Sequence, residues 1–149
     1  MPPFSDSTDG YAQSRFSLHG RVLVETEGAL LLNVAEGPFN RELVLALGSL
    51  LATRIPEMQA QGDWVLLAVI RHSTLATDEA LVAFTDMLRH IAATGRAPRA
   101  VAHVTPLDVE GVGLMDEPMA RCFAAAGIPF AGFREEPPAR AWLAGRLAG

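Results

Sequence analysis

Short apolar runs alternate along this chain with longer stretches in which apolar residues recur every three or four positions. Continuous short runs are typical of strands buried on both faces of a sheet, and the wider spacing is typical of amphipathic helices. The continuous runs lie at residues 29–34, 64–70, 100–104 and 128–133. The pattern therefore predicts four strands, and the uninterrupted run 64–70 should lie at the centre of the sheet.

Helical spacing begins directly after the run 29–34. Asn40 is the expected N-cap, because its short side chain can accept a hydrogen bond from the first free amides of a helix. Leucines then follow at helical spacing from Leu43 to Leu51. This helix should end near Ile55, because Pro56 disfavours helical geometry in the residue before it.

Three further helices are predicted between and after the remaining strands. Thr77 should cap the first and Gly95 should close it. The next covers 113–126 and should be closed by Gly127, and the last opens at 135–138, where proline is tolerated in a first turn. Their apolar stripes comprise Leu81, Phe84, Leu88 and Ile91; Leu114, Met115, Met119, Cys122 and Phe123; and Ala139, Trp142, Leu143 and Leu147.

The N-terminal region is expected to hold a tail and a hairpin. Residues 1–13 are polar, contain proline and glycine, and should form a flexible tail. Residues 16–26 read as a strand that is bent or bulged at Gly20. The turn at 27–28 should join it to the continuously apolar strand 29–34 in an antiparallel hairpin.

The resulting order, β-β-α-β-α-β-α-β-α, predicts an α/β fold. Strands that alternate with helices form parallel sheets with right-handed crossovers. We therefore expect a mixed, mainly parallel central sheet flanked by helices. With no internal repeat or linker, residues 14–149 should form a single domain.

Composition and charge narrow the class of protein. The chain has 149 residues, half of them hydrophobic, and a formal net charge of −5. Its arginines are scattered among the acids, so neither nucleic acid nor an anionic membrane surface is an expected partner. A lone cysteine, Cys122, excludes an internal disulfide and suits a reducing compartment. Neither a signal peptide nor a membrane span is expected, so the predicted location is the cytoplasm.

Sequence motifs for catalysis or nucleotide binding do not occur. The chain lacks G-x-G-x-x-G, G-x-x-x-x-G-K-[ST] and G-x-S-x-G. Cys122 lies on an apolar helical stripe and should be a core residue. The paired carboxylates at 78–79, 116–117 and 135–136 stand at helix starts, where they compensate the helix dipole. We therefore predict a non-enzymatic protein with no cofactor and no catalytic residues.

Two histidines are candidates for a ligand site. His72 and His103 lie near the carboxyl ends of adjacent predicted strands, where open α/β sheets bind ligands. With Asp108 in the following loop they could form a two-histidine, one-carboxylate metal site. The four histidines show no H-x-x-x-H or H-x-H spacing, however, so packing is the preferred interpretation and no metal is expected.

Three hydroxyl side chains follow the central strand. Ser73, Thr74 and Thr77 read as loop and N-cap residues. They are also candidates for phosphorylation or partner contact, since a helix N-terminus favours phosphate.

Five stretches occur in a recognisable order. They are Glu36-Gly37-Pro38-Phe39-Asn40, Trp64-Val65-Leu66-Leu67-Ala68, Thr77-Asp78-Glu79-Ala80, Ala100-Val101-Ala102 and the run from Phe133 through Ala141-Trp142-Leu143. In this order they resemble the SpoIIAA-like proteins of the STAS (STAS-Sec14-like) superfamily, over about residues 16–147. The resemblance implies helices on one main side of the sheet and a regulatory role in protein–protein contacts. The Asp-Ser signature of anti-sigma-factor antagonists is absent from 71–79; Thr77 is the nearest hydroxyl by place and Ser73 the next.

Two functions follow from these observations. The first is a regulatory or protein-interaction module whose partner, an unidentified protein or a second copy, binds the helix starting at Thr77 and the loop before it. A homodimer through the edge of the first hairpin is one form of this. The alternative is a small-molecule or lipid carrier with an apolar pocket at the carboxyl edge of the sheet, lined by Met115 and Met119.

Overall fold

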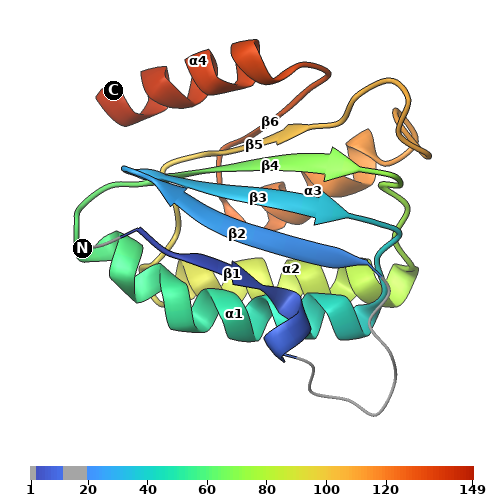
Figure 1. Ribbon diagram of the computed structural model, residues 1–149, viewed down its shortest axis with the longest axis horizontal. Helices are drawn as coiled ribbons and strands as arrows, with labels where there is room; N and C mark the ends of the chain where they lie inside the picture. Colours follow the sequence, from blue (N-terminus) through green and yellow to red (C-terminus); the bar gives the residue numbers. More distant parts are fainter. Residues whose placement is uncertain (1–2, 12–19) are drawn as a thin grey trace.

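A six-stranded sheet forms the centre of the computed structural model, which describes residues 3–11 and 20–149 (Figure 1). Its strands are β1 (Ser5–Ser7), β2 (Arg21–Glu27), β3 (Leu30–Glu36), β4 (Val65–Arg71), β5 (Val101–Val104) and β6 (Phe130–Phe133). The helices are α1 (Arg41–Gln59), α2 (Asp78–Ala93), α3 (Asp116–Ala126) and α4 (Glu136–Ala148), with a 3-10 turn, η1, at Thr8–Tyr11.

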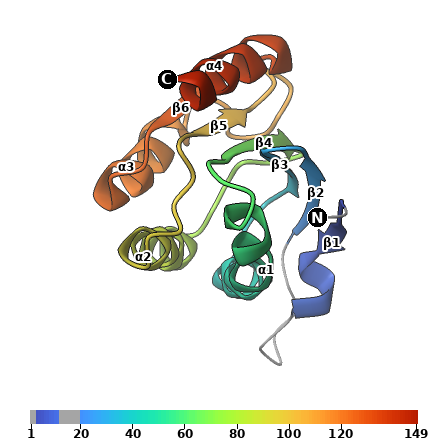
Figure 2. The same ribbon diagram turned by 90° about the vertical axis from the view of Figure 1, so that its left-hand side faces the viewer.

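The strands lie side by side in their order along the chain. β1, β2 and β3 pair antiparallel, and β3 to β6 pair parallel. Each crossover from β3 onward therefore steps in the same direction, and its helix, α1, α2 or α3, lies on the same face (Figure 2). Among the helices that the structure describes, only α4 covers the other face. The predicted mixed, mainly parallel α/β sheet is confirmed, as is the antiparallel hairpin.

Helix ends follow the predicted capping chemistry at three positions. The side chain of Asn40 accepts a hydrogen bond from the Leu43 amide at 3.0 Å. Thr77 Oγ1 accepts one from the Ala80 amide at 3.1 Å. Gly127 closes α3 with φ of 70°, a left-handed conformation that suits glycine.

Helix α1 does not stop at Ile55, as proline at 56 led us to expect. It continues through Pro56 to Gln59. A proline inside a helix costs about 3 kcal/mol. The extra turn buries Met58 beneath the sheet, with 1% of its surface exposed. Burial of such a side chain contributes about 1.5–3 kcal/mol, which offsets much of the cost.

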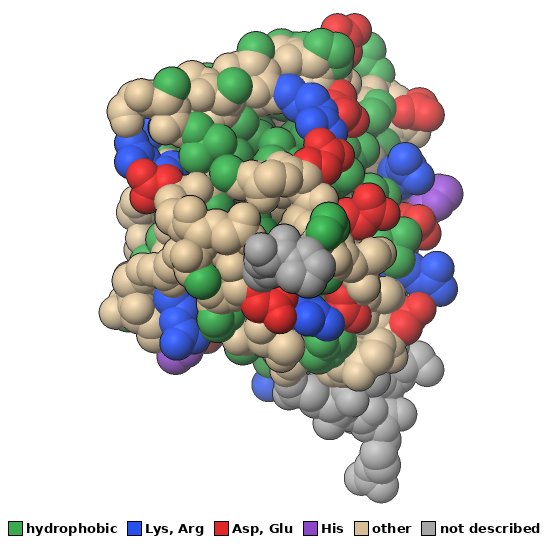
Figure 3. All heavy atoms as spheres, turned by 60° about the vertical axis from the view of Figure 1, so that its left-hand side comes forward, with side chains coloured by type: hydrophobic (Ala, Val, Ile, Leu, Met, Phe, Trp, Pro, Cys, Tyr) green, Lys and Arg blue, Asp and Glu red, His purple; other side chains and the backbone are tan. Residues whose placement is uncertain are grey.

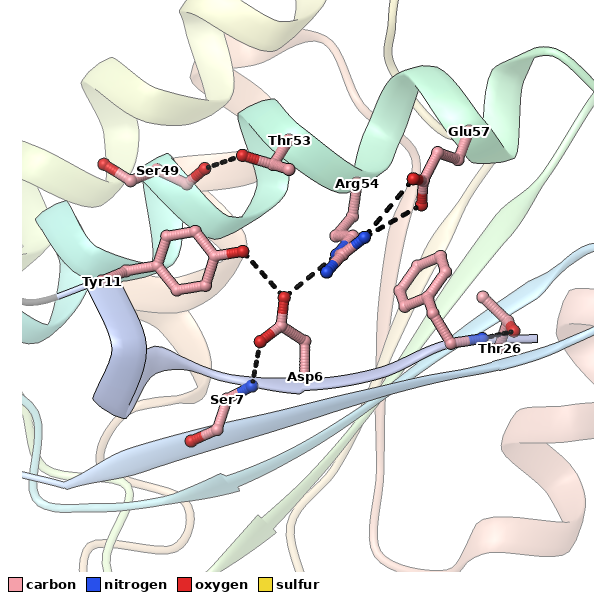
Figure 4. Close-up of polar contacts among 9 residues, drawn as sticks. Asp6, Ser7, Tyr11, Thr26, Ser49, Thr53, Arg54 and Glu57 are labelled. Carbon is pink, nitrogen blue, oxygen red and sulfur yellow. Dashed lines mark hydrogen bonds and ion pairs between the residues drawn. The ribbon is translucent and has the colours of Figure 1, made fainter. Parts of the chain in front are cut away.

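The expected flexible tail is wrong for residues 5–11. β1 pairs with the outer side of β2, with Ser5 opposite Glu25. Asp6 Oδ2 accepts hydrogen bonds from Tyr11 Oη at 2.8 Å and Arg54 Nε at 3.0 Å, which fastens this segment to α1 (Figure 4). Burial raises the pKa of Asp6, but these hydrogen bonds and one from the Ser7 amide outweigh it and lower the pKa. Polar anchoring of this kind leaves no hydrophobic pattern in the sequence.

The pairing of β1 also changes the expectation for the first hairpin. Its outer edge is covered along Leu23–Glu25 by the chain itself, so those backbone groups are not open to a second copy. Residues 16–19 of the predicted strand 16–26, and His19 with them, lie outside the described residues; β2 begins at Arg21. Gly20 precedes the strand with φ of 90°, and an added Cβ there would lie 2.4 Å from the Glu36 carbonyl oxygen.

The core has two parts, one on each face of the sheet. Between the sheet and α1–α3, the buried side chains include Leu31, Leu50, Met58 and Phe123. Cys122 belongs to this part, as predicted, with 5% of its surface exposed. Leu114 does not: α3 begins only at Asp116, and Leu114 is 71% exposed in the preceding loop.

The second part lies between the sheet and α4. Here Val65, Leu67 and Val104 pack against Ala139 and Leu143, while Leu30, Leu32, Trp142 and Leu147 are partly buried around them. Figure 3 shows hydrophobic side chains gathered below the uppermost part of the molecule, which α4 forms. Arg140 ties α4 to the hairpin through Glu27, at 2.9 Å. One helix thus covers β4 to β6 more fully than β2 and β3.

Candidate functional site

The loops at the carboxyl edge of the parallel strands are bonded to one another. After β3, the Phe39 amide donates to the Leu75 carbonyl oxygen at 2.8 Å. After β4, the Thr74 amide donates to the Glu110 carbonyl oxygen at 2.9 Å, and the Glu110 amide donates to the His72 carbonyl oxygen at 3.0 Å. The edge between β3 and β5 is therefore closed by its own backbone, not left as an open crevice.

The three candidate hydroxyl residues occupy different environments in this edge. Ser73 is 3% exposed; its Oγ donates to Glu110 Oε1 at 2.8 Å and accepts from the Leu75 amide at 3.1 Å. Thr74 is 5% exposed. Thr77 is exposed, but its hydroxyl oxygen caps α2. A phosphoryl group on Ser73 would meet the Glu110 carboxylate, so of the three only Thr77 is open to modification without rearrangement.

The candidate ligand residues His72, His103 and Asp108 lie in separate settings. His72 is on the outside: its side chain is 70% exposed, its φ is 66°, and Nε2 lies 3.8 Å from Glu36 Oε2. Asp108 is an exposed residue of the loop after β5. Within residues 3–11 and 20–149, no three His, Cys, Asp or Glu side chains are grouped so that they could hold a metal ion.

His103 points into the protein, toward α3. Its ring makes edge-to-face contacts with Phe123 and Phe130, at centroid distances of 5.4 and 4.9 Å. Burial among these groups lowers its pKa from 6.5 to about 4, because the charged imidazolium is disfavoured away from water. His103 is therefore a neutral imidazole near pH 7, with one nitrogen that donates and one that accepts.

An outer cleft opens at the carboxyl end of β5 and β6. It encloses about 490 Å³ and is lined by His103, Thr105, Met115, Met119, Phe133 and Arg134, among others. Arg134 pairs with Asp116 at 2.5 Å across its rim, which joins β6 to the start of α3. The two methionines expected to line a pocket at this edge do so, but the cleft is shallow and partly polar.

A longer groove runs between α1 and α2 on the outer surface and encloses about 960 Å³. Its floor combines apolar side chains with small ones, which are Val44, Leu45, Leu51, Ile55, Met87 and Ile91 together with Gly48, Ser49, Ala52 and Ala83. Val82, at 62% exposure, stands on its α2 side. Small residues along a floor let another backbone approach closely.

Charged side chains border this groove without partners. Asp78, Glu79 and Asp86 lie along α2, and Arg41 and Arg96 stand at the two ends. None of the five forms an ion pair with any residue that the structure describes. The α2 rim of the groove therefore carries three carboxylates without an ion-pair partner among the described residues, with His90 farther along the same helix.

Comparisons with known proteins give no family: no family model, no curated protein and no solved structure matches the chain. The resemblance to the STAS superfamily therefore stays a prediction. None of the helices in the described part of the chain is long and apolar enough to cross a lipid bilayer.

Three features of these sites were not predicted from the sequence. Asn33 is a buried polar residue inside the strand that we described as continuously apolar, and its amide side chain was the signal to notice. Glu110, which bonds Ser73, lies in a loop with no pattern of its own. Asp86 belongs to the groove only because α1 packs beside α2.

Proposed function

We propose that this chain is a non-catalytic, STAS-like protein-interaction module and that its docking surface is the groove between α1 and α2. The occupant that fits is an amphipathic helix of a partner protein, with an apolar face and basic residues beside it. The predicted contact through the helix that starts at Thr77 is kept in this proposal. The single observation that carries it is the apolar groove bordered by the unpaired carboxylates of α2.

The shape of the groove favours a helix as the occupant. The residues along its floor recur every three or four positions on both α1 and α2, so the groove follows the axes of two neighbouring helices. A third helix laid in such a groove presents anchors at the same spacing. Gly48 leaves room at its middle, since an added Cβ would come no closer than 3.7 Å to Met87.

Charge favours a basic occupant. Asp78 or Glu79 and Asp86 are separated by about two turns on the same helix. Lysine or arginine residues seven apart on a partner helix would face both positions. Such pairs at a rim contribute more to association rate and orientation than to affinity.

The surroundings of the candidate nucleophiles, Cys122 and Ser73, support a function without catalysis. The Cys122 sulfur is buried and faces the Leu81 carbonyl oxygen at 3.9 Å, not a base. Ser73 donates to a carboxylate that belongs to the loop structure. A lone cysteine also supports a reducing, cytoplasmic location for the module. The sequential strand order, with helix after strand stepping one way, supports the STAS-like layout.

Two synthetic peptides of roughly five helical turns test the proposal. Both carry leucines at helical spacing; one has arginines seven positions apart and the other has glutamates there. We expect the full chain to bind the arginine peptide saturably in fluorescence anisotropy and to bind the glutamate peptide at least about tenfold more weakly.

Variants of the chain show whether the groove is the binding surface. Gly48→Leu should fill the floor and abolish binding, and Asp86→Arg should weaken the arginine peptide by about three- to tenfold. Glu25→Arg is the matched control, because it makes the same charge change on an exposed position of β2. Equal binding of the two peptides, or loss with Glu25→Arg as large as with Asp86→Arg, would show the proposal to be wrong.

A further inference from the structure

Five residues form a straight row across the sheet on the face toward α1, α2 and α3. Val24 lies opposite Asn33, Asn33 opposite Ala68, Ala68 opposite His103, and His103 opposite Gly132. Two polar side chains therefore stand on either side of an alanine, on alternate strands. Neighbouring strands are about 4.8 Å apart, so the Cα atoms of Asn33 and His103 are separated by about 10 Å.

The side chain of Asn33 is buried without full hydrogen bonding. Only 6% of its surface is exposed, and Oδ1 has no hydrogen-bond partner among the described residues. An unpaired buried acceptor costs about 1–3 kcal/mol. Native proteins rarely keep such a group, and a bound molecule that donates a hydrogen bond would remove the cost.

A cavity of about 110 Å³ lies against this row, between the sheet and helices α1, α2 and α3. Asn33, Ala68 and His103 all line it. Apart from Thr74, the other walls are hydrophobic or aromatic, with Trp64, Phe84, Met87, Phe123 and Met119 among them, and no charged side chain contributes. Ala68 carries only a methyl group between the longer side chains of Asn33 and His103, so the row is low at its middle.

His103 closes one end of the cavity as a second polar group. Its ring contacts are with Phe123 and Phe130, and neither ring nitrogen is hydrogen-bonded within the part of the chain described. It also lines the outer cleft at the end of β5 and β6, so the imidazole separates the interior from that cleft. Its neutral form offers both a donor and an acceptor.

We propose that this cavity binds a small uncharged aromatic alcohol, of about the size of phenol. The hydroxyl donates to Asn33 Oδ1, and the ring lies over Ala68 toward His103. Each part of the ligand follows from one feature of the site: the unpaired acceptor requires a donor, the uncharged walls exclude an ion, and the aromatic and thioether walls favour a ring.

Volume excludes the lipid carrier as the use of this cavity. A cavity of roughly 150 Å³ holds a benzene-sized molecule. The cavity beside Asn33, at about 110 Å³, is somewhat smaller, so a single aromatic ring fills it completely. An acyl chain would need several times this volume.

Phenol and toluene, which differ in a hydroxyl and a methyl group, are the probes. We expect the full chain to bind phenol saturably, one molecule per chain, in isothermal titration calorimetry. Asn33→Leu replaces the acceptor with an apolar side chain of similar size. It should lower the ratio of phenol to toluene affinity about tenfold while toluene binding is kept. A parallel loss of both ligands would contradict the role of Asn33.

A measurement on the unsubstituted chain covers the case in which Asn33→Leu does not fold. Nuclear Overhauser contacts should appear between the phenol ring protons and the Ala68 methyl group, and not the Ala125 methyl group on α3. If phenol gives no saturable binding, the proposal is wrong. Phenol binding does not depend on the α1–α2 groove. Failure of the peptide test therefore does not contradict the cavity proposal, and failure of the phenol test does not contradict the groove proposal.

Discussion

The two faces of the central sheet are both covered by helices, but their side chains pack differently. The face toward α4 presents a row of aliphatic side chains, from Leu32 across Leu67 to Ala102, and one helix packs on it. The face toward α1, α2 and α3 is covered by three helices, yet its middle row contains Asn33 and His103 and borders a cavity. Polar side chains and a cavity thus occur on the face that more helices cover.

The two faces of the sheet therefore differ in how far their packing serves stability. On the α4 face, the side chains that pack beneath the helix are apolar, among them Val65, Leu67 and Ala102. On the three-helix face, a cavity remains that is lined by Asn33, Ala68 and His103, among others. Protein interiors are close-packed, so space beside an unpaired acceptor indicates that something other than stability determines this row.

Among the substitutions that test this difference between the two faces, truncation of Leu143 should have the largest effect on stability. The side chain is fully buried between α4 and the sheet. Leu143→Ala should lower the free energy of unfolding by about 2–5 kcal/mol, because it removes buried methyl groups and leaves a new cavity. Urea denaturation measures this, with Leu147→Ala, at a partly exposed position of α4, as the control. A loss below about 1 kcal/mol would mean that α4 is not tightly packed.

Acidification should lower the free energy of unfolding through His103, which lies on the three-helix face. Its pKa is about 4 in the folded chain and near 6.5 when solvated. Between these values the unfolded chain binds more protons than the folded chain, so the free energy of unfolding falls as pH falls from 6.5 to 4. The full difference is about 3–4 kcal/mol at most, and it is present above pH 6.5.

The matched variant for this titration is His103→Gln, which keeps a polar side chain that does not titrate. Urea denaturation at several pH values should give a shallower pH dependence for the variant than for the unsubstituted chain in that window. Curves that run parallel would show that His103 is accessible to water in the folded chain.

The smallest effect is expected at the helix starts. The Thr77 side chain caps α2 on the three-helix face, whereas Glu135 precedes α4 with no side-chain capping bond. Thr77→Ala should therefore cost about 1 kcal/mol, and Glu135→Ala close to none. Thermal denaturation of the two variants side by side would check this, and an equal loss would remove the distinction.

Elements with strong local signals were predictable from the sequence. The run from Trp64 to Ile70 predicted a central strand because both faces of β4 are buried. Asn40, Thr77 and Gly127 marked helix ends because capping is a local interaction within a few residues. The mixed α/β sheet then followed from the alternation of strands and helices.

The rest depended on contacts between distant residues. Asp6 is fastened by Arg54, which lies 48 positions away in the sequence. The register that places Asn33, Ala68 and His103 in one row is set only when three strands pair. The groove and the cavity exist because α1 packs beside α2, and periodicity within a single helix does not describe such a space.

The short strand β1 has a consequence for any shortened form of this protein. It is three residues long, polar, and occupies the outer side of β2. A chain that begins after residue 13 would present the unpaired amides and carbonyls of β2, with Val22 and Val24 beneath them. Bare strands of this kind join molecules into aggregates. We therefore expect Ser5–Ser7 to protect the chain from aggregation, and the loss of this strand to appear first as turbidity and poor recovery.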